Sequence, residues 1–202
     1  MTARTPATAR SRRTRAELAK AAHDQIASYG TLNGEGIAAA AGVSIATVYA
    51  HFETHDDAIA AALDTSLTDV VGVVERVFHI ESLIENGLEH VLGLLIPAMH
   101  DVFQRESLVL RAAQSRLMAH QSTRQIYRGH EDRSIEHLTR HIDLGQKAAL
   151  LRAGPPQKRA ITMLVLLQGL HNPVLTKKRL DPMVADDLQR VLHALVGPTP
   201  AA

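Results

Sequence analysis

Twelve histidines are present in the chain, and three of them have a spacing that could bind a metal ion. His137 and His141 are four residues apart, and His130 lies seven residues before His137. On a helix this spacing lines up three imidazoles, which Zn²⁺ or Ni²⁺ could use. No HExxH motif is present, and Arg133 and Arg140 are unfavourable neighbours for a cation. We therefore interpret these residues as solvent-facing or core-edge histidines and predict no metal site.

Nucleophilic catalysis has less support than metal binding. Serines and histidines occur, but no GxSxG or comparable strand-to-helix elbow surrounds any of them. The chain has no cysteine, which excludes thiolate chemistry, thiolate metal sites and disulfides. We predict a protein that is not an enzyme and has no cofactor.

The stretch GEGIAAAAGVSIATVYAHF, residues 34–52, predicts two short helices joined by a tight turn. Gly42 supplies the turn, Ser44 is a good N-cap for the second helix, and Ala38 is small enough for the helices to cross closely. This is the pattern of a helix-turn-helix, the element that binds DNA. The alternative is a tight helical corner inside a core.

The second helix of this pair has two opposite faces. At about 100° per residue, Val48 and Phe52 point together toward the first helix of the chain. Ala46 and Ala50 point away from them, toward base edges if the helix enters a major groove. The flanks carry Thr47 and Tyr49, whose hydroxyls would meet the phosphates on either side of the groove.

The segment IAAAAGVSIATVYAHFETHDDAIAAAL, residues 37–63, resembles the DNA-binding domain of the TetR (tetracycline repressor-like) family of bacterial regulators. It follows that family's pattern of a helix, a GVS turn, a Thr-aliphatic-Tyr-X-His-Phe recognition helix and an acidic start of the fourth helix. Beyond residue 63, helix count, length and an apolar last pair of helices agree. The resemblance implies a homodimer that binds a two-fold symmetric operator and releases it when a small molecule occupies a C-terminal pocket.

The resemblance also implies individual DNA contacts. The positions that match the family's backbone-contacting residues are Thr47, Tyr49 and His51. The positions that often read bases are Ile45, Ala46 and Ala50, which cannot form side-chain hydrogen bonds but can contact thymine methyl groups. The expected contacts at helix starts are Asn33, Ser44 and His55. His55 stands where the family usually has a phosphate-binding Lys, and a neutral imidazole would bind the phosphate more weakly.

Basic residues are concentrated at the N-terminus, although the net charge of the whole chain is only +1. The first sixteen residues contain no acidic residue and carry Arg4, Arg10, Arg12, Arg13 and Arg15. We expect residues 1–11 to form a flexible basic arm, and Arg12 and Arg13 to contact DNA in an adjacent minor groove or at phosphates. The alternative is a disordered, solubilising tail.

Apolar residues recur at three- and four-residue spacing, and aromatics make up only 3% of the chain. These features predict an all-α fold of about nine helices. We expect a three-helix DNA-binding domain over residues 12–54 and a larger helical domain for ligand binding and dimerisation over residues 55–202. Gly30 should end the first helix, and Pro97 should kink a helix or begin one. With neither a signal peptide nor a membrane span, we expect a cytoplasmic protein.

The last part of the chain contains two strongly apolar helices. AITMLVLLQGL, residues 160–170, is apolar on every side, which a helix tolerates only when protein covers it all round. We expect a homodimer interface made of Ile161, Leu164, Val165, Leu188, Val191, Leu192 and Leu195. The alternative is that these two helices only close the core.

An effector pocket is predicted from helical phase and composition alone. Its candidates combine apolar side chains with a few polar ends. They are Met99, Phe103, Gln114, Met118, Tyr127, His137, His141, Met163, Leu167 and His171. The sequence thus predicts a ligand-responsive DNA-binding regulator, a repressor released by a small, mainly hydrophobic effector. The alternative is a helical interaction or metal-responsive protein with a weak or vestigial DNA-binding helix.

Overall fold

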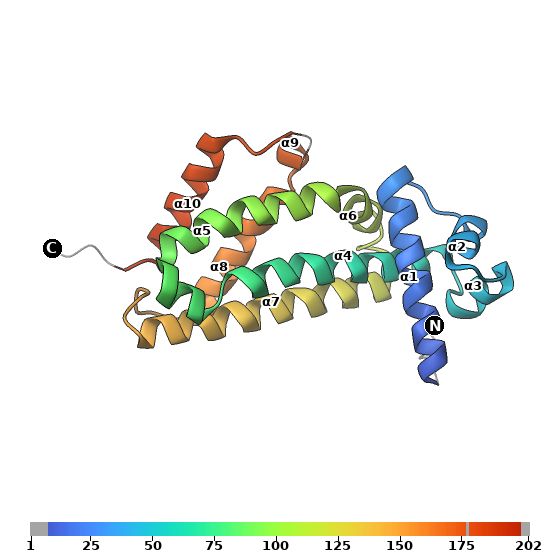
Figure 1. Cartoon of the computed structure of the whole chain (residues 1–202), viewed down its shortest axis with the longest axis horizontal. Helices are drawn as coiled ribbons and strands as arrows, with labels where there is room; N and C mark the ends of the chain where they lie inside the picture. The colour runs from blue at the N-terminus through green and yellow to red at the C-terminus, as the bar shows by residue number, and fades with distance from the viewer. Residues whose placement is uncertain (1–7, 177, 199–202) are drawn as a thin grey trace. The chain divides into compact units, whose positions relative to one another are not determined.

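The computed structural model describes residues 8–176 and 178–198, and within these ranges every regular element is helical (Figure 1). The α-helices are α1 (Ala9–Tyr29), α2 (Gly34–Ala41), α3 (Ile45–His51), α4 (His55–Val77), α5 (Ile80–Arg105), α6 (Ser107–Gln114), α7 (Gln121–Lys147), α8 (Pro156–Gln168), α9 (Pro173–Thr176) and α10 (Pro182–Val196). A short 3₁₀-helix, η1 (Gly169–His171), follows α8. The predicted all-α fold is confirmed, with ten α-helices in the described ranges where about nine are expected.

Packing divides the described chain into two compact units. The first unit consists of the described residues of Met1–Thr68 together with Arg105–Gly129. The second consists of Asp69–Gln104 together with the described residues of His130–Ala202. The boundaries fall within α4 and α7, so the first unit contains α6 and parts of α4 and α7 in addition to residues 12–54.

In the first unit, α1 lies beside α2 and α3 (Figure 1). It begins earlier than expected, because the Thr8 hydroxyl accepts a hydrogen bond from the Ser11 N–H (3.2 Å) and caps the helix. Residues 9–11 of the expected arm are therefore helical, and residues 1–7 lie outside the described part of the chain. Gly30 ends α1 at φ 69°, as expected. Tyr29 does not share the buried face, since its side chain is 77% exposed at the end of the last turn.

Two helices of the second unit differ from the sequence-based expectation. The break in α5 lies at Gly87, whose φ of 77° only glycine adopts readily, and Pro97 lies inside the helical run that follows. The sequence favours a helix that continues to about Arg152, but α7 ends at Lys147. The reason is that Ala149 turns to φ 57° and Leu151 folds back onto Gly145, where an added Cβ would lie 2.7 Å from Leu151 Cδ1.

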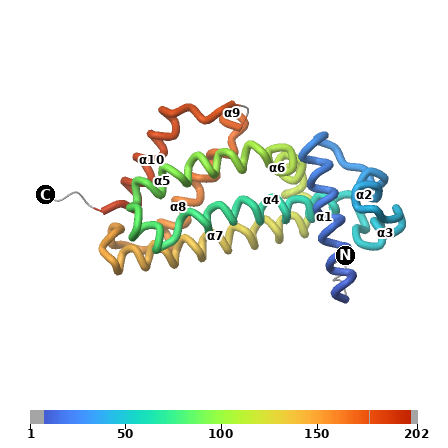
Figure 2. Tube along the Cα trace, in the orientation of Figure 1, coloured from blue at the N-terminus to red at the C-terminus, as the bar shows by residue number. Residues whose placement is uncertain are grey.

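Helices α5, α8 and α10 form much of the second unit and lie side by side (Figure 2). The Gln189 side chain of α10 donates a hydrogen bond to the Glu89 carbonyl of α5 (3.2 Å). Met163 and Leu167 of α8 and Leu192 of α10 are buried. No helix in the described ranges is both long enough and apolar enough to cross a membrane.

Candidate nucleic-acid interface

The α2–α3 corner has the caps and the turn that its sequence predicts. Asn33 Oδ1 accepts a hydrogen bond from the Gly36 N–H (2.6 Å), and Ser44 Oγ accepts one from the Thr47 N–H (3.2 Å). Gly42 has φ 65°, and its N–H bonds back to carbonyls of α2. Each helix therefore starts at a satisfied N-cap, and the turn between them has a geometry that favours glycine.

Helix α3 has the two faces that its sequence predicts. Val48 and the following Phe52 are buried, while Ala46 and Ala50 are exposed on the opposite side. Ile45 and Tyr49 are also largely exposed. The outward surface of α3 is thus built from small and apolar side chains, with one aromatic hydroxyl at its edge.

The hydroxyls on the flanks of α3 already have neighbours. Thr47 Oγ1 lies 2.9 Å from Ser44 Oγ, so it belongs to the cap as well as to the flank. A Cβ added to Gly34 would lie 3.3 Å from the Tyr49 hydroxyl, which places this hydroxyl against the N-terminus of α2. The Tyr49 hydroxyl and the start of α2 therefore lie together on one surface, and a phosphate contact there stays a prediction.

His55 at the start of α4 is held by the preceding loop. Its Nε2 donates a hydrogen bond to the Leu32 carbonyl (2.8 Å), so only Nδ1 remains to face a phosphate. Next to it, the Asp57 carboxylate accepts hydrogen bonds from the backbone N–H (3.0 Å) and the hydroxyl of Thr54 (2.9 Å). These contacts fix the beginning of α4, and a phosphate contact through His55 requires a protonated Nδ1.

Arg15 makes structural contacts with the end of α3 that the sequence did not reveal. Its guanidinium donates a hydrogen bond to the His51 carbonyl at the end of α3 (2.5 Å) and lies 4.9 Å from the centroid of the Phe52 ring. A cation at a helix C-terminus is favoured by the helix dipole, and its position over an aromatic face adds a cation–π contact. The sequence did contain a sign of this role, because Arg15 lies three residues before the buried Leu18 and so on the inward side of α1.

The two arginines next to the arm that are expected to contact DNA, Arg12 and Arg13, have different surroundings. Arg13 is exposed and pairs with Glu17 at 2.9 Å. Arg12 lines an open groove of about 360 Å³ in the first unit, together with Arg15 and residues of α4 such as Asp57 and Ala60. DNA contact by Arg12 and Arg13 stays a prediction, as it does for the residues of α3.

The predicted effector residues do not form one cluster. Met99, Phe103, Met163 and Leu167 are buried in the second unit. The ring of His171 lies near Phe103, at a centroid distance of 5.5 Å.

The other candidates lie in other places. Gln114, Met118 and Tyr127 belong to the first unit. Gln114 is exposed and Met118 is 90% exposed, so the expectation that they line an enclosed pocket is wrong for this unit. The sequence favours a helix around residues 107–120, which would bring Gln114 and Met118 onto one side, but α6 ends at Gln114 and turns follow it.

His137 and His141 fasten α7 to the corner between α4 and α5. His137 Nε2 donates to the Phe78 carbonyl (2.7 Å), and His141 Nδ1 accepts from the Ile80 N–H (3.0 Å). Burial lowers the pKa of His141, and the adjacent His137 lowers this pKa further. No group of three or more potential metal ligands occurs among the described residues. The pair therefore has a structural role that the stripe of three histidines did not suggest.

The expected dimer residues divide between the surface and the core. Ile161, Val165 and Val191 are exposed, with Val165 at 60%, while Leu188 and Leu195 are half-buried. Leu164 and Leu192 are buried inside their own chain, so placing them at an interface is wrong: their side of each helix packs inward within the unit.

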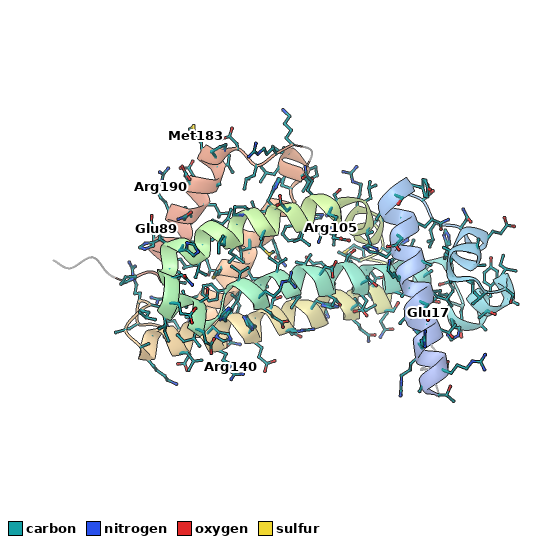
Figure 3. All side chains as sticks on the ribbon, in the orientation of Figure 1. Glu17, Glu89, Arg105, Arg140, Met183 and Arg190 are labelled. Carbon is teal, nitrogen blue, oxygen red and sulfur yellow. The ribbon has the colours of Figure 1, made fainter. Side chains whose placement is uncertain are left out.

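Two further apolar residues of α10 are exposed and were not predicted, Met183 and Val184. Met183 and Arg190 project from α10 away from α5 (Figure 3). The exposed apolar residues of α10 therefore begin at Met183, nearer the N-terminus of the helix than Leu188, the first interface residue expected there.

The geometry of α2 and α3 defines a helix-turn-helix protein, and comparison with known proteins places its fold. No protein-family model matches the chain, and no curated protein matches it. Among solved structures, a protein from Mesorhizobium loti assigned to the TetR family is 20% identical and has a TM-score of 0.73, over 94% of this chain and 100% of that one. A TetR transcription regulator from Haloarcula marismortui is 19% identical (TM-score 0.68, 91% and 96% covered).

A transcriptional regulator from Saccharomonospora viridis, solved in complex with choline, is 23% identical to this chain (TM-score 0.63, 91% and 95% covered). The similarity to all three structures extends over nearly the whole length of both chains. The chain has the fold of TetR-family transcriptional regulators.

Proposed function

We propose that the protein is a transcriptional regulator that binds a palindromic operator as a homodimer, represses transcription and is released by a small effector. The observation that carries the proposal is the α2–α3 corner. There, α3 exposes Ala46 and Ala50, while its buried side and its C-terminal carbonyl are held by Phe52 and Arg15. A helix supported in this way can enter a major groove as a rigid element.

Base recognition by α3 would depend on methyl contacts and groove shape. Ile45, Ala46 and Ala50 offer no side-chain donor or acceptor, so they can distinguish bases only through apolar contact with thymine methyl groups. The remaining selectivity would come from the deformability and width of the grooves. The Tyr49 hydroxyl, His51 and the starts of α2 and α4 would fix the register by contacting phosphates.

The homodimer would form through the exposed apolar residues of α8 and α10. Ile161 and Val165 on α8 and Val184 and Val191 on α10 leave apolar surface in contact with water. Contiguous exposed apolar surface commonly marks an association site, and a two-fold contact of this kind would match a two-fold operator.

The effector would bind in the second unit, near the buried residues around Met99, Phe103 and Met163. This region is apolar and has a polar end at the His171 ring beside Phe103, which suits a small, mainly hydrophobic and mildly polar molecule. The similar regulator from Saccharomonospora viridis in complex with choline supports an effector of small size.

Selection from a random double-stranded DNA library with the purified full chain tests the proposal. At moderate salt we expect enrichment of a palindrome rich in thymine at the positions that face α3. The matched variants are Ala50→Asp, which places a charge on the reading face, and Glu53→Ala, an exposed change just beyond α3. If no palindrome is enriched by the unmodified protein, the chain is better explained as a helical interaction module.

A further inference from the structure

The carboxylate of Glu106 is buried in the first unit, although charged side chains normally lie at the protein surface. The side chain of Glu106 is 1% exposed. The residue precedes α6, but it makes no capping hydrogen bond to its own helix. Its Oε2 instead lies 2.6 Å from His23 Nε2 of α1 and 2.6 Å from the Ser66 hydroxyl of α4. Through this one oxygen atom, Glu106 joins the start of α6 to α1 and α4.

The second ring nitrogen of His23 also faces a carboxylate. Nδ1 lies 3.0 Å from Asp24 Oδ1, and Asp24 Oδ2 in turn accepts a hydrogen bond from Lys20 (2.5 Å). An ionised carboxylate can only accept hydrogen bonds. With both carboxylates ionised, both bonds form only when each nitrogen of His23 carries a proton, that is, when the ring is an imidazolium. A neutral ring would present a lone pair to one of the two carboxylates, which is repulsive.

The electrostatics of the three groups agree with this assignment. The hydrogen bond to Glu106 raises the pKa of His23 above 6.5; burial opposes this rise, and Asp24 adds to it. Burial on its own would raise the pKa of Glu106, but the hydrogen bonds from His23 and Ser66 outweigh burial and lower it. The pKa of Asp24 is also lowered, because the bonds from Lys20 and His23 outweigh its burial. All three shifts therefore favour the charged forms of the histidine and of both acids.

We propose that His23 is a proton-binding switch of the first unit: its imidazolium, held between Glu106 and Asp24, strengthens the contact of α1 with the start of α6, and loss of the proton weakens this contact. Charged groups surround the ring from both sides. Asp24 faces it from α1 and is paired with Lys20, Glu106 faces it from the start of α6, and Arg105 Nε lies 3.2 Å from Glu106 Oε1.

A change at His23 would affect α3 through α1, because α1 also carries Arg15, which donates a hydrogen bond to the end of α3. A weaker contact between α1 and α6 would leave α3 less firmly supported. This consequence for DNA affinity rests on the proposed function, whereas the proton site itself does not.

The sign of the pH dependence follows from the direction of each shift. The pKa of His23 is raised, so its stabilisation is complete below 6.5, the value of an unperturbed histidine, and is lost as pH rises through the pKa of the folded state. The pKa of Glu106 is lowered from 4.5, so its stabilisation is present above that value and is lost in acid. The contact between α1 and α6 is therefore strongest in weakly acidic solution and weakens toward alkaline pH.

The direct test is an NMR titration of the histidine ring protons in the full-length protein. We expect a resonance assigned to His23, absent in His23→Gln, to titrate above 6.5. In Glu106→Gln, which removes the negative charge but keeps the shape, this pKa should fall. A His23 pKa at or below 6.5 in the unmodified protein overturns the proposal, and that measurement does not depend on whether either variant folds.

Thermal unfolding between about pH 6 and pH 9 tests the role of the proton. In the unmodified protein the midpoint should fall as pH rises, and His23→Gln should flatten this dependence, because a Gln amide donates to Glu106 at any pH. The control is His90→Gln, an exposed histidine of α5, which should leave the dependence unchanged. Equal slopes for His23→Gln and the unmodified protein would count against the switch.

Operator affinity over the same pH range separates the switch from the proposed function. His51 and His55 lie at the DNA surface in every variant, so only the difference between unmodified protein and His23→Gln reports on His23. A pKa shift of one unit between the DNA-bound and the free protein corresponds to about a tenfold change in affinity. If His23 titrates as expected but no operator is bound at any pH, the proton site stands and the proposed function fails. If the operator is bound with equal pH dependence in both proteins, the link from α1 to α3 is refuted.

Discussion

Arg15→Met is the substitution that best tests how α3 is supported. Methionine keeps most of the length and apolar packing of the arginine side chain but removes the donor and the charge. The bond from the guanidinium to the His51 carbonyl (2.5 Å) joins a charged donor to a helix C-terminus, and such bonds contribute about 1.5–3 kcal/mol. The contact with the Phe52 ring at 4.9 Å adds about 0.5–1 kcal/mol.

Because Arg15 is half-buried and partly screened by water, we expect the free energy of unfolding to fall by about 2–3 kcal/mol rather than by the full sum. For a chain of this length, that loss lowers the midpoint of thermal unfolding by about 4–12 °C. Circular dichroism measures both quantities. Operator binding should weaken in parallel, since the carbonyl that loses its partner belongs to the last residue of α3.

The matched control is Arg13→Met, two residues earlier on the same helix. Arg13 is exposed and pairs with Glu17 four residues on, a contact that contributes roughly 0.3–0.5 kcal/mol. Arg15→Lys should be intermediate, because it keeps the charge and loses the planar group over the Phe52 ring. If Arg15→Met and Arg13→Met unfold at the same temperature, the support of α3 by Arg15 is refuted.

Three further predictions concern the turns and the surface. Ala149→Gly should stabilise the protein by about 1 kcal/mol in thermal unfolding, because Ala149 has φ 57°; a lower midpoint would contradict this. Asn33→Ala should cost about 0.5–2 kcal/mol in the same assay, since the Asn33 side chain caps α2, and an unchanged midpoint would show that the cap contributes nothing. Val165→Asp should shift the mass measured by light scattering toward the monomer, while Val174→Asp, also on an exposed valine, should not; equal masses would rule out α8 as the interface.

The sequence predicts this structure best where the contacts are local. The caps at Asn33 and Ser44 and the helix end at Gly30 depend on residues at most four positions apart, and all three are as expected. The orientation of α3 is also local, because helical phase alone decides that Val48 points inward.

Contacts between distant residues could not be predicted in this way. His23 and Glu106 are 83 positions apart, and Arg15 and His51 are 36 apart, so no helical period connects them. Helical phase also indicates an apolar side without showing what covers it. Leu192 and Val191 are both apolar neighbours on α10, yet one faces its own core and the other faces solvent.

The exposed surface of α3 has a consequence for the evolution of specificity. Ala46 and Ala50 make no contribution to the core, and the position of the helix depends on Val48, Phe52 and Arg15. Under the proposed function, substitutions on the outward positions would change the preferred DNA sequence at little cost in folding stability, since surface changes of this kind are usually within about 0.5 kcal/mol. Alanine at both positions would then make α3 a neutral starting point, from which one polar side chain at a time creates a new operator preference.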